Sequence, residues 1–202
     1  MNSGILIAFE GIDGTGKSTQ CRMLSELLTK NKISNIVFAE PTKGKWGMKI
    51  RKLLSEGRKC ISPEEELEWF INDRKEDVEI NIQPALNAGK VVLMDRYYFS
   101  TAAYQGALGF DPQEIKADNE NFAPQPDRVL IFHNSPEKSL QRIEFSREKK
   151  SAFEKRDYLI DVQNIFKSFS GSTVRFIYSD DTLENVHENV VREVKDLFKL
   201  NL

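Results

Sequence analysis

Five short apolar runs, each rich in β-branched or aromatic residues, recur along the chain between longer segments with helical spacing. They are GILIAFE (4–10), NIVFAE (35–40), VVLMDRY (91–97), DRVLIFH (127–133) and TVRFIYS (173–179). Apolar runs without alternation are typical of strands buried on both faces, as in a parallel sheet. Strands that alternate with helices need crossover connections, which place helices on both faces of the sheet. The sequence therefore predicts a three-layer α/β fold around a five-stranded parallel sheet.

The segments between these runs carry helix signals. Apolar residues at spacings of three and four predict one buried helix face after the first run: Cys21, Leu24, Leu27 and Leu28. Ser62 is a typical N-cap residue and Pro63 is favoured in a first helical turn, so we expect a long helix from there to about Asn87. A last helix is expected over about residues 183–198.

Length and composition exclude several classes of protein. The 202 residues suit a single domain over residues 1–202 with a substantial core. The net charge of −2 and the pI near 5.8 argue against binding to a nucleic acid polymer, which needs a clustered positive surface. We find no apolar run of about 18 residues and no cationic leader, so we expect no membrane span and no export. Cys21 and Cys60 lack metal-ligand or disulfide spacing, which favours packing roles and a cytoplasmic location.

Residues 11–18 read GIDGTGKS and match the phosphate-binding pattern G-x-x-x-x-G-K-[ST]. A strand is predicted directly before this motif and a helix directly after it, which is the context that the pattern requires. The glycines let backbone amides point inward at a helix N-terminus, where an anion is favoured. Lys17 can reach the β and γ phosphates of a nucleotide, and the Ser18 hydroxyl can coordinate Mg²⁺. The residues expected around the phosphates are Gly11, Ile12, Asp13, Gly14, Thr15, Gly16, Lys17, Ser18 and Thr19.

A second polar pair follows the third apolar run. Asp95 ends that run, so its carboxylate is expected at the carboxyl edge of the sheet, where ligands bind in open α/β folds. There it can orient Mg²⁺ or its waters. The guanidinium of Arg96 has five donors in a planar fork, which suits a second phosphate facing the first. The alternative interpretation of the pair is a surface turn.

Several motifs together resemble the thymidylate kinases, in the nucleoside monophosphate kinase branch of P-loop proteins. They are FEGIDGTGKSTQ (9–20), EPT (40–42), FINDR (70–74), QPAL (83–86) and DRYYFSTAAYQG (95–106), and the resemblance covers about residues 4–169. It implies the three-layer P-loop kinase fold. It also implies Mg²⁺-dependent transfer of the γ-phosphoryl group of ATP to dTMP, which gives dTDP and ADP in dTTP biosynthesis, by an enzyme that is usually a homodimer.

The resemblance assigns roles to individual residues on the acceptor side. Asp13 would touch the 3′-hydroxyl of the deoxyribose, and Arg51 and Arg96 would clamp the monophosphate for in-line attack. Phe70 would stack on the base and Arg74 would hydrogen-bond to it. Thr101 and Gln105 are expected at the polar edge of thymine, and Tyr104 beside the deoxyribose. Ser100 is also expected to contact the acceptor.

Two of these assignments leave alternatives open from the residues alone. Arg74 falls on the apolar stripe of its helix, four residues after Phe70, and a buried arginine needs a partner. That partner is a thymine carbonyl or a carboxylate on a neighbouring strand or loop. Glu40, at the end of the second apolar run, is either a group that orders waters near magnesium or phosphate, or a solvated strand end.

Residues 142–156 read RIEFSREKKSAFEKR and are strongly basic. They form either a solvated helix face or a basic flap, and the resemblance implies a lid that closes over ATP. Because the phosphate loop carries Thr15 and no arginine, we expect Arg147 to reach the transferring group. Arg142 is the second choice, and Lys149 and Lys150 are helpers. The segment lacks the usual Asp-Arg of the family, the EPTKGKWG loop (40–47) differs from the frequent E-P-G-G-T, and Phe166 replaces a tyrosine of many relatives.

Two other functions compete with this prediction. A deoxynucleoside kinase also combines a phosphate loop with an acidic residue and an arginine, but its acceptor has no phosphate for Arg51 and Arg96 to bind. A GTP-dependent switch would need an N-K-x-D run after a strand. The only Asn-Lys pair, at residues 31–32, continues as Ile-Ser and precedes the second predicted strand.

Overall fold

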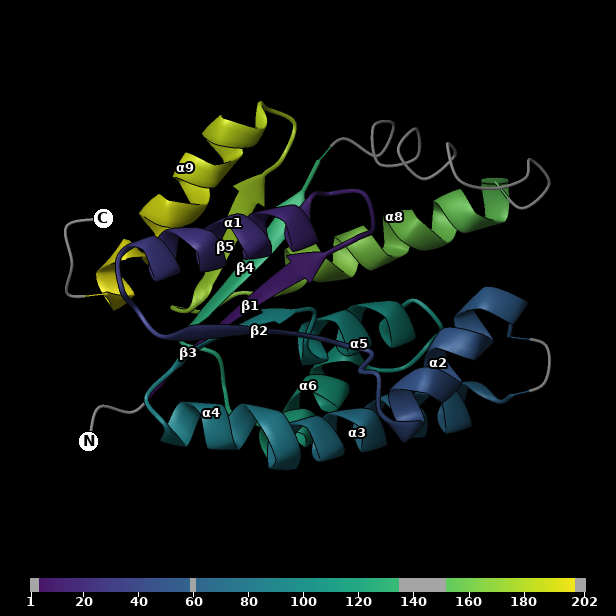
Figure 1. Ribbon diagram of the computed structural model, residues 1–202. Helices are drawn as coiled ribbons and strands as arrows, with labels where there is room; N and C mark the ends of the chain where they lie inside the picture. The colour runs from purple at the N-terminus through teal and green to yellow at the C-terminus, as the bar shows by residue number, and fades with distance from the viewer. Residues whose placement is uncertain (1–3, 59–60, 135–151, 199–202) are drawn as a thin grey trace.

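The computed structural model describes residues 4–58, 61–134 and 152–198. Its centre is a five-stranded sheet in the order β2-β3-β1-β4-β5, and every pair of neighbours is parallel (Figure 1). The strands are β1 (Ile5–Gly11), β2 (Asn35–Ala39), β3 (Val91–Asp95), β4 (Arg128–His133) and β5 (Val174–Tyr178). Each of the five apolar runs therefore forms the predicted strand, and the α/β class with a parallel sheet is confirmed.

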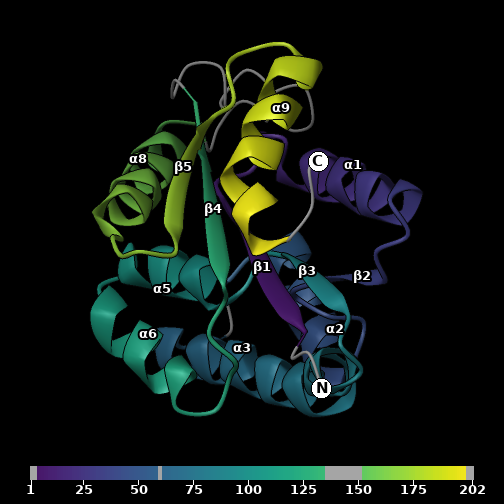
Figure 2. The same cartoon turned by 90° about the vertical axis from the view of Figure 1, so that its left-hand side faces the viewer.

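Helices cover both faces of the sheet (Figure 2). One face carries α1 (Lys17–Lys30) and α9 (Leu183–Val194), which ends in a 3₁₀ turn (Lys195–Leu197). The other face carries α3 (Pro63–Asp77), a π-helical segment (Val78–Ile82), α4 (Gln83–Asn87), α5 (Tyr98–Gly106) and α8 (Ala152–Ser168). In an outer position, α2 (Lys45–Glu56) packs on α3 and α6 (Pro112–Glu120) packs on α5.

Successive residues of β1 face opposite sides of the sheet, and both sides are buried. Leu6 and Ala8 belong to the core beneath α5 and α8, whereas Ile7 and Phe9 belong to the core beneath α1 and α9. Cys21 lies in the second core, where burial raises the pKa of its thiol, so it is an inert packing residue as expected. Cys60 lies outside the described residues.

Burial on both faces was predicted for all five strands, and it is wrong for the two at the edges. Val37 on β2 is 42% exposed, and Phe176 and Tyr178 on β5 are 44% and 54% exposed. An edge strand has one neighbour and only partial cover from helices, so part of its surface meets solvent. A short apolar run does not reveal this difference.

The long helix begins as expected, because the Ser62 hydroxyl accepts a hydrogen bond from the amide of Glu65 at 3.2 Å. Its interior differs from the prediction, since the π-helical segment separates α3 from α4. Pro84 lies two residues after the end of that segment and has no N–H for the regular helical bond, which accounts for a local change of winding. None of the helices in the described part of the chain has the length and apolar character needed to cross a bilayer.

Candidate nucleotide-binding site

The phosphate loop connects the end of β1 to the start of α1. Gly11, Gly14 and Gly16 have φ angles of 128°, 80° and 88°, which side chains rarely tolerate. At Gly11 a Cβ would also lie 2.3 Å from the carbonyl oxygen of Phe132 on β4, so the strand can turn here only without a side chain. The loop thus brings backbone amides to the N-terminus of α1, where a phosphate would be favoured.

Lys17 folds back across this loop. Its Nζ donates a hydrogen bond to the carbonyl of Ile12 at 2.8 Å, and the Thr15 hydroxyl donates to the same oxygen at 2.8 Å. Burial, assisted by the nearby Arg96 cation, lowers the pKa of Lys17 to about 7. A bound phosphate would favour the charged lysine again, because an opposite charge at short range raises its pKa.

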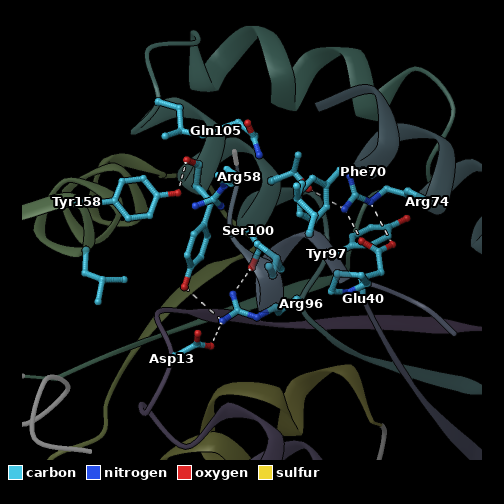
Figure 3. A pocket seen from close by; sticks show the side chains of 18 residues that line it. Asp13, Glu40, Arg58, Phe70, Arg74, Arg96, Tyr97, Ser100, Gln105 and Tyr158 are labelled. Atoms are coloured by element: carbon cyan, nitrogen blue, oxygen red, sulfur yellow. Dashed lines mark hydrogen bonds and ion pairs between the residues drawn. The ribbon is translucent and has the colours of Figure 1, made fainter. Parts of the chain in front are cut away.

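Asp95 and Arg96 lie where the sequence predicted, at the carboxyl edge of the sheet. Asp95 pairs in register with Phe9 of β1. The backbone of Arg96 has a φ of 72°, an uncommon angle for a side-chain-bearing residue. Its guanidinium pairs with Asp13 and donates to Ser100 Oγ at 2.9 Å (Figure 3). It also lies over the ring of Tyr104, 5.1 Å from the ring centroid. The two motifs predicted to hold phosphates therefore meet across a side-chain contact.

A cavity of about 960 Å³ opens beside this contact. It lies between the ends of β1 and β2, helices α2, α3 and α5, and the first half of α8. The predicted site residues that line it are Asp13, Glu40, Phe70, Arg74, Arg96, Ser100, Thr101, Tyr104 and Gln105. Its size suits a ligand of the dimensions of a nucleotide, since small-molecule sites span about 300–1,000 Å³.

Arg74 is buried with a carboxylate partner from a neighbouring strand end. Its guanidinium forms a salt bridge with both oxygens of Glu40 and donates to Asn119 Oδ1 at 2.6 Å. It also donates to Thr101 Oγ1 at 3.0 Å. Of the alternatives left open by the sequence, the carboxylate is therefore the partner in this structure. Glu40 is itself buried, so it is not a solvated strand end, and burial raises its pKa to about 8 against the opposing effect of Arg74.

Gln105 is fully buried and faces a residue that sequence reasoning did not single out. Its amide nitrogen donates to Glu66 Oε1 at 2.9 Å, and its Oε1 has no hydrogen-bond partner within the described ranges. Glu66 also accepts two bonds from Arg58 Nε, at 3.1 and 2.8 Å. Arg58 lines the cavity and lies over the ring of Tyr158. Glu66 precedes Phe70 by one helical turn, a signal that could have placed it on the cavity side.

Arg51 is not among the residues that line the cavity. It is exposed on α2, and its guanidinium donates to the carbonyl oxygens of Pro41 and Thr42, the latter at 3.1 Å. Thr42 is held in turn by Asp73, which accepts from its amide at 2.8 Å and its hydroxyl at 2.6 Å. Arg51 thus lies at the rim of the site and stabilises the loop that follows β2.

Glu10 is a second residue that the sequence analysis did not use. It lies directly before Gly11, is fully buried and accepts hydrogen bonds from the amide of Tyr97 and the hydroxyl of Ser100. Burial raises its pKa to about 7, while the Ser100 bond and the Arg96 charge act in the opposite direction. An acidic residue inside an apolar strand run was the available signal.

Arg142, Arg147, Lys149 and Lys150 of the predicted lid lie outside the described residues, whereas residues 152–156 form the start of α8. Within the described ranges there is no cluster of three or more His, Cys, Asp or Glu suited to a metal ion. Ser18 lies in the first turn of α1 and Asp95 ends β3 beside β1, and their hydroxyl and carboxylate oxygens are of the kind that Mg²⁺ accepts as ligands.

Comparison with known proteins gives a consistent result. The family model of thymidylate kinase matches residues 9–190. A thymidylate kinase of Desulfotalea psychrophila is 46% identical over 200 residues, which are 98% of each chain. A probable thymidylate kinase of Archaeoglobus fulgidus is 43% identical over 97% of each chain, and a thymidylate kinase of Akkermansia muciniphila is 42% identical over 93% of this chain and 89% of its own. With this fold and these motifs, the chain belongs to the thymidylate kinase family.

Proposed function

We propose that this protein is a dTMP kinase, which transfers the γ-phosphoryl group of ATP to dTMP and releases dTDP and ADP. The observation that carries the proposal is the contact between the two half-sites, where Arg96 of the acceptor cavity meets Asp13 of the phosphate loop. A donor phosphate in the loop and an acceptor phosphate at Arg96 would then face each other. Phosphoryl transfer depends mainly on such alignment and on charge stabilisation.

On the donor side, the amides of residues 11–19 would hold the ATP phosphates, and Lys17 would turn from Ile12 to the β and γ oxygens. Ser18 and Asp95 would hold Mg²⁺, which neutralises negative charge on the phosphates when bound. The lid residues Arg147 and Arg142 remain the expected contacts to the transferring group and to ATP.

On the acceptor side, Arg96 would bind the monophosphate, with Arg51 at the rim as the expected second cation, and Asp13 would accept a bond from the 3′-hydroxyl. Phe70 offers its ring to the base. The contacts of Arg74 within the described residues use four of its five N–H groups, which leaves one Nη1 hydrogen for a thymine carbonyl. Glu40 would then act by holding Arg74 at the base.

The homodimer implied by the family is also a proposal. Ile80, in the π-helical segment, is 62% exposed and is the most exposed large hydrophobic residue in the described part of the chain. We expect the native chain to have the mass of a dimer by light scattering and the Ile80→Glu variant to shift toward the monomer. The cytoplasmic location expected from the cysteine content remains a prediction.

The direct test is a coupled ADP-release assay with ATP and Mg²⁺ over a panel of nucleoside monophosphates and thymidine. We expect strong preference for dTMP, and a loss on the order of 10²-fold in kcat/KM for dTMP in the Arg74→Ala variant, because misplacing a substrate by about 1 Å costs that much. Equal use of dCMP or GMP would refute the substrate. Phosphorylation of thymidine in preference to dTMP would favour a deoxynucleoside kinase instead.

A further inference from the structure

Glu10 is a buried carboxylate that no step of the proposed reaction uses. Its side chain has no exposed surface, and in the described part of the chain it forms no ion pair within 4.0 Å. A buried acidic group without a direct cationic partner is costly, so it needs strong hydrogen bonds. Such a group beside a binding cavity calls for a functional explanation.

Two neutral donors satisfy the carboxylate. The amide of Tyr97 donates to Oε1 at 2.8 Å, and the hydroxyl of Ser100 donates to Oε2. Because the Ser100 hydrogen is used in this way, its oxygen presents lone pairs to other donors. Arg96 Nη1 occupies that position at 2.9 Å. A chain of hydrogen bonds therefore runs from Arg96 through Ser100 to Glu10.

This chain joins the two half-sites. Glu10 belongs to the strand that leads into the phosphate loop, whereas Ser100 belongs to the first turn of α5, which lines the acceptor cavity. The bond to the Tyr97 amide also fixes the start of that helix. One carboxylate thus sets the position of α5 and the hydroxyl beneath the Arg96 guanidinium.

The other contacts of Arg96 are less able to hold it. Its carboxylate partner Asp13 has a side chain that is 70% exposed, and ion pairs at such positions contribute little. The bond to the Gly11 carbonyl is 3.2 Å and that to the Tyr104 hydroxyl is 3.4 Å. Of the bonds from Arg96 to neutral groups, the one to Ser100 is the shortest, at 2.9 Å, and it leads on to a buried carboxyl group.

We propose that Glu10 is a positioning residue for phosphate recognition: acting through Ser100, it holds the Arg96 guanidinium at the place where the acceptor phosphate must meet the phosphate loop. The inference rests on the proposed function, since it takes Arg96 as the group that binds the acceptor phosphate. Glu10 does not touch either substrate. Its effect through Arg96 falls on the phosphate, not on the base or on ATP, and this is the effect that the test isolates.

The test isolates the phosphate contact by comparing two ligands. Calorimetry gives Kd for dTMP and for thymidine, and the ratio of the two reports what the phosphate adds. In the Glu10→Gln variant, the shape is kept but the amide nitrogen faces Ser100 and the charge is lost. We expect the ratio to fall on the order of tenfold, while Kd for thymidine and for ATP in the presence of Mg²⁺ changes by less than about twofold.

Two variants make the outcome specific. Asp127→Asn is the matched control, because Asp127 also accepts a bond from a backbone amide, that of Leu6 on β1 at 2.8 Å, yet it does not line the cavity. We expect its affinity ratio to equal that of the native chain. If the Glu10→Gln variant is unfolded at the temperature of the binding measurement, Ser100→Ala interrupts the same chain of hydrogen bonds at a smaller side chain. The same fall in the ratio of the two Kd values is expected.

The possible results separate the inference from the proposed function. If Arg96→Ala leaves the ratio unchanged, Arg96 does not bind the phosphate and the proposed role of Arg96 fails. If Arg96→Ala lowers the ratio but Glu10→Gln and Ser100→Ala leave it unchanged, the role of Glu10 is refuted and that of Arg96 stands. An equal weakening of thymidine and dTMP in Glu10→Gln would also refute it, because it would indicate a general structural role.

Discussion

The two halves of the site are built in different ways. The donor half is made of consecutive residues whose backbone amides would do most of the binding, with glycines at φ angles that side chains rarely adopt. The acceptor half is made of side chains from segments far apart in sequence. Its central pairs, Arg74 with Glu40 and Gln105 with Glu66, are separated by 34 and 39 residues.

This difference predicts how substitutions in each half affect activity and stability. A phosphate site built from backbone amides depends on local turns, and Lys17 is the side chain proposed to reach the transferring phosphate. The acceptor half depends on buried charges that satisfy each other, so removing one member leaves another without a partner. We therefore expect donor-side substitutions to lower the rate with little loss of stability, and acceptor-side substitutions to lower both.

The largest effect is expected from Lys17→Met. The change removes the cation that would reach the transferring phosphate, while the apolar stem is retained in a buried position. We expect kcat to fall on the order of 10³-fold, as for the loss of a strong electrostatic contact to a developing charge. The melting temperature should stay near that of the native chain, since the single Nζ bond to Ile12 is lost together with the charge that needed it. A fall of less than tenfold in steady-state kcat would contradict this role.

The next effect tests the acceptor half through stability. Glu40→Met and Arg74→Met should each lower the free energy of unfolding by about 3–5 kcal/mol, because each leaves a buried ionisable group without its partner. The double variant should lose less than the sum of the two, and urea denaturation of all four proteins measures the coupling. Additive losses would show that the two side chains act independently and would break the contrast between the halves.

The same contrast explains how much could be predicted from the sequence. The phosphate loop, the strands and the position of Asp95 follow from local patterns, and the structure places them as predicted. The partner of Arg74 did not follow, because its spacing on α3 predicts burial but cannot specify which strand end lies opposite. The resemblance to the family named Gln105 as a substrate contact, yet only the fold shows its amide directed at Glu66. The exposure of the edge strands likewise depends on neighbours that the sequence does not identify, whereas the π-helical segment lies just before Pro84, a signal that the sequence did contain.

A smaller effect is expected from Glu66→Gln. The variant loses the charge that pairs with Arg58 at 2.8 Å and places a second amide against Gln105. We expect kcat/KM for dTMP to fall about tenfold, in line with the 1.5–3 kcal/mol of a hydrogen bond to a charged group. KM for ATP should not change. Glu68→Gln, on the exposed side of the same helix, is the matched control and should behave as the native chain. An unchanged kcat/KM in Glu66→Gln would show that the cavity tolerates a displaced Gln105.

The smallest effect concerns protons, and it tests the donor half. With a pKa of about 7, Lys17 is largely neutral at pH 8 in the free protein, and a bound phosphate raises its pKa so that the amine takes up a proton. ATP binding at pH 8 should therefore be accompanied by uptake of a fraction of one proton, and uptake at this site should vanish at pH 6, where Lys17 is already charged. Calorimetry in buffers of different ionisation enthalpy measures this number of protons.

The Lys17→Arg variant is the control. Its guanidinium is charged at both pH values, so the difference in proton uptake from the native chain assigns the proton to Lys17 and not to Glu10. Equal uptake in the two proteins would mean that Lys17 is already charged before ATP binds.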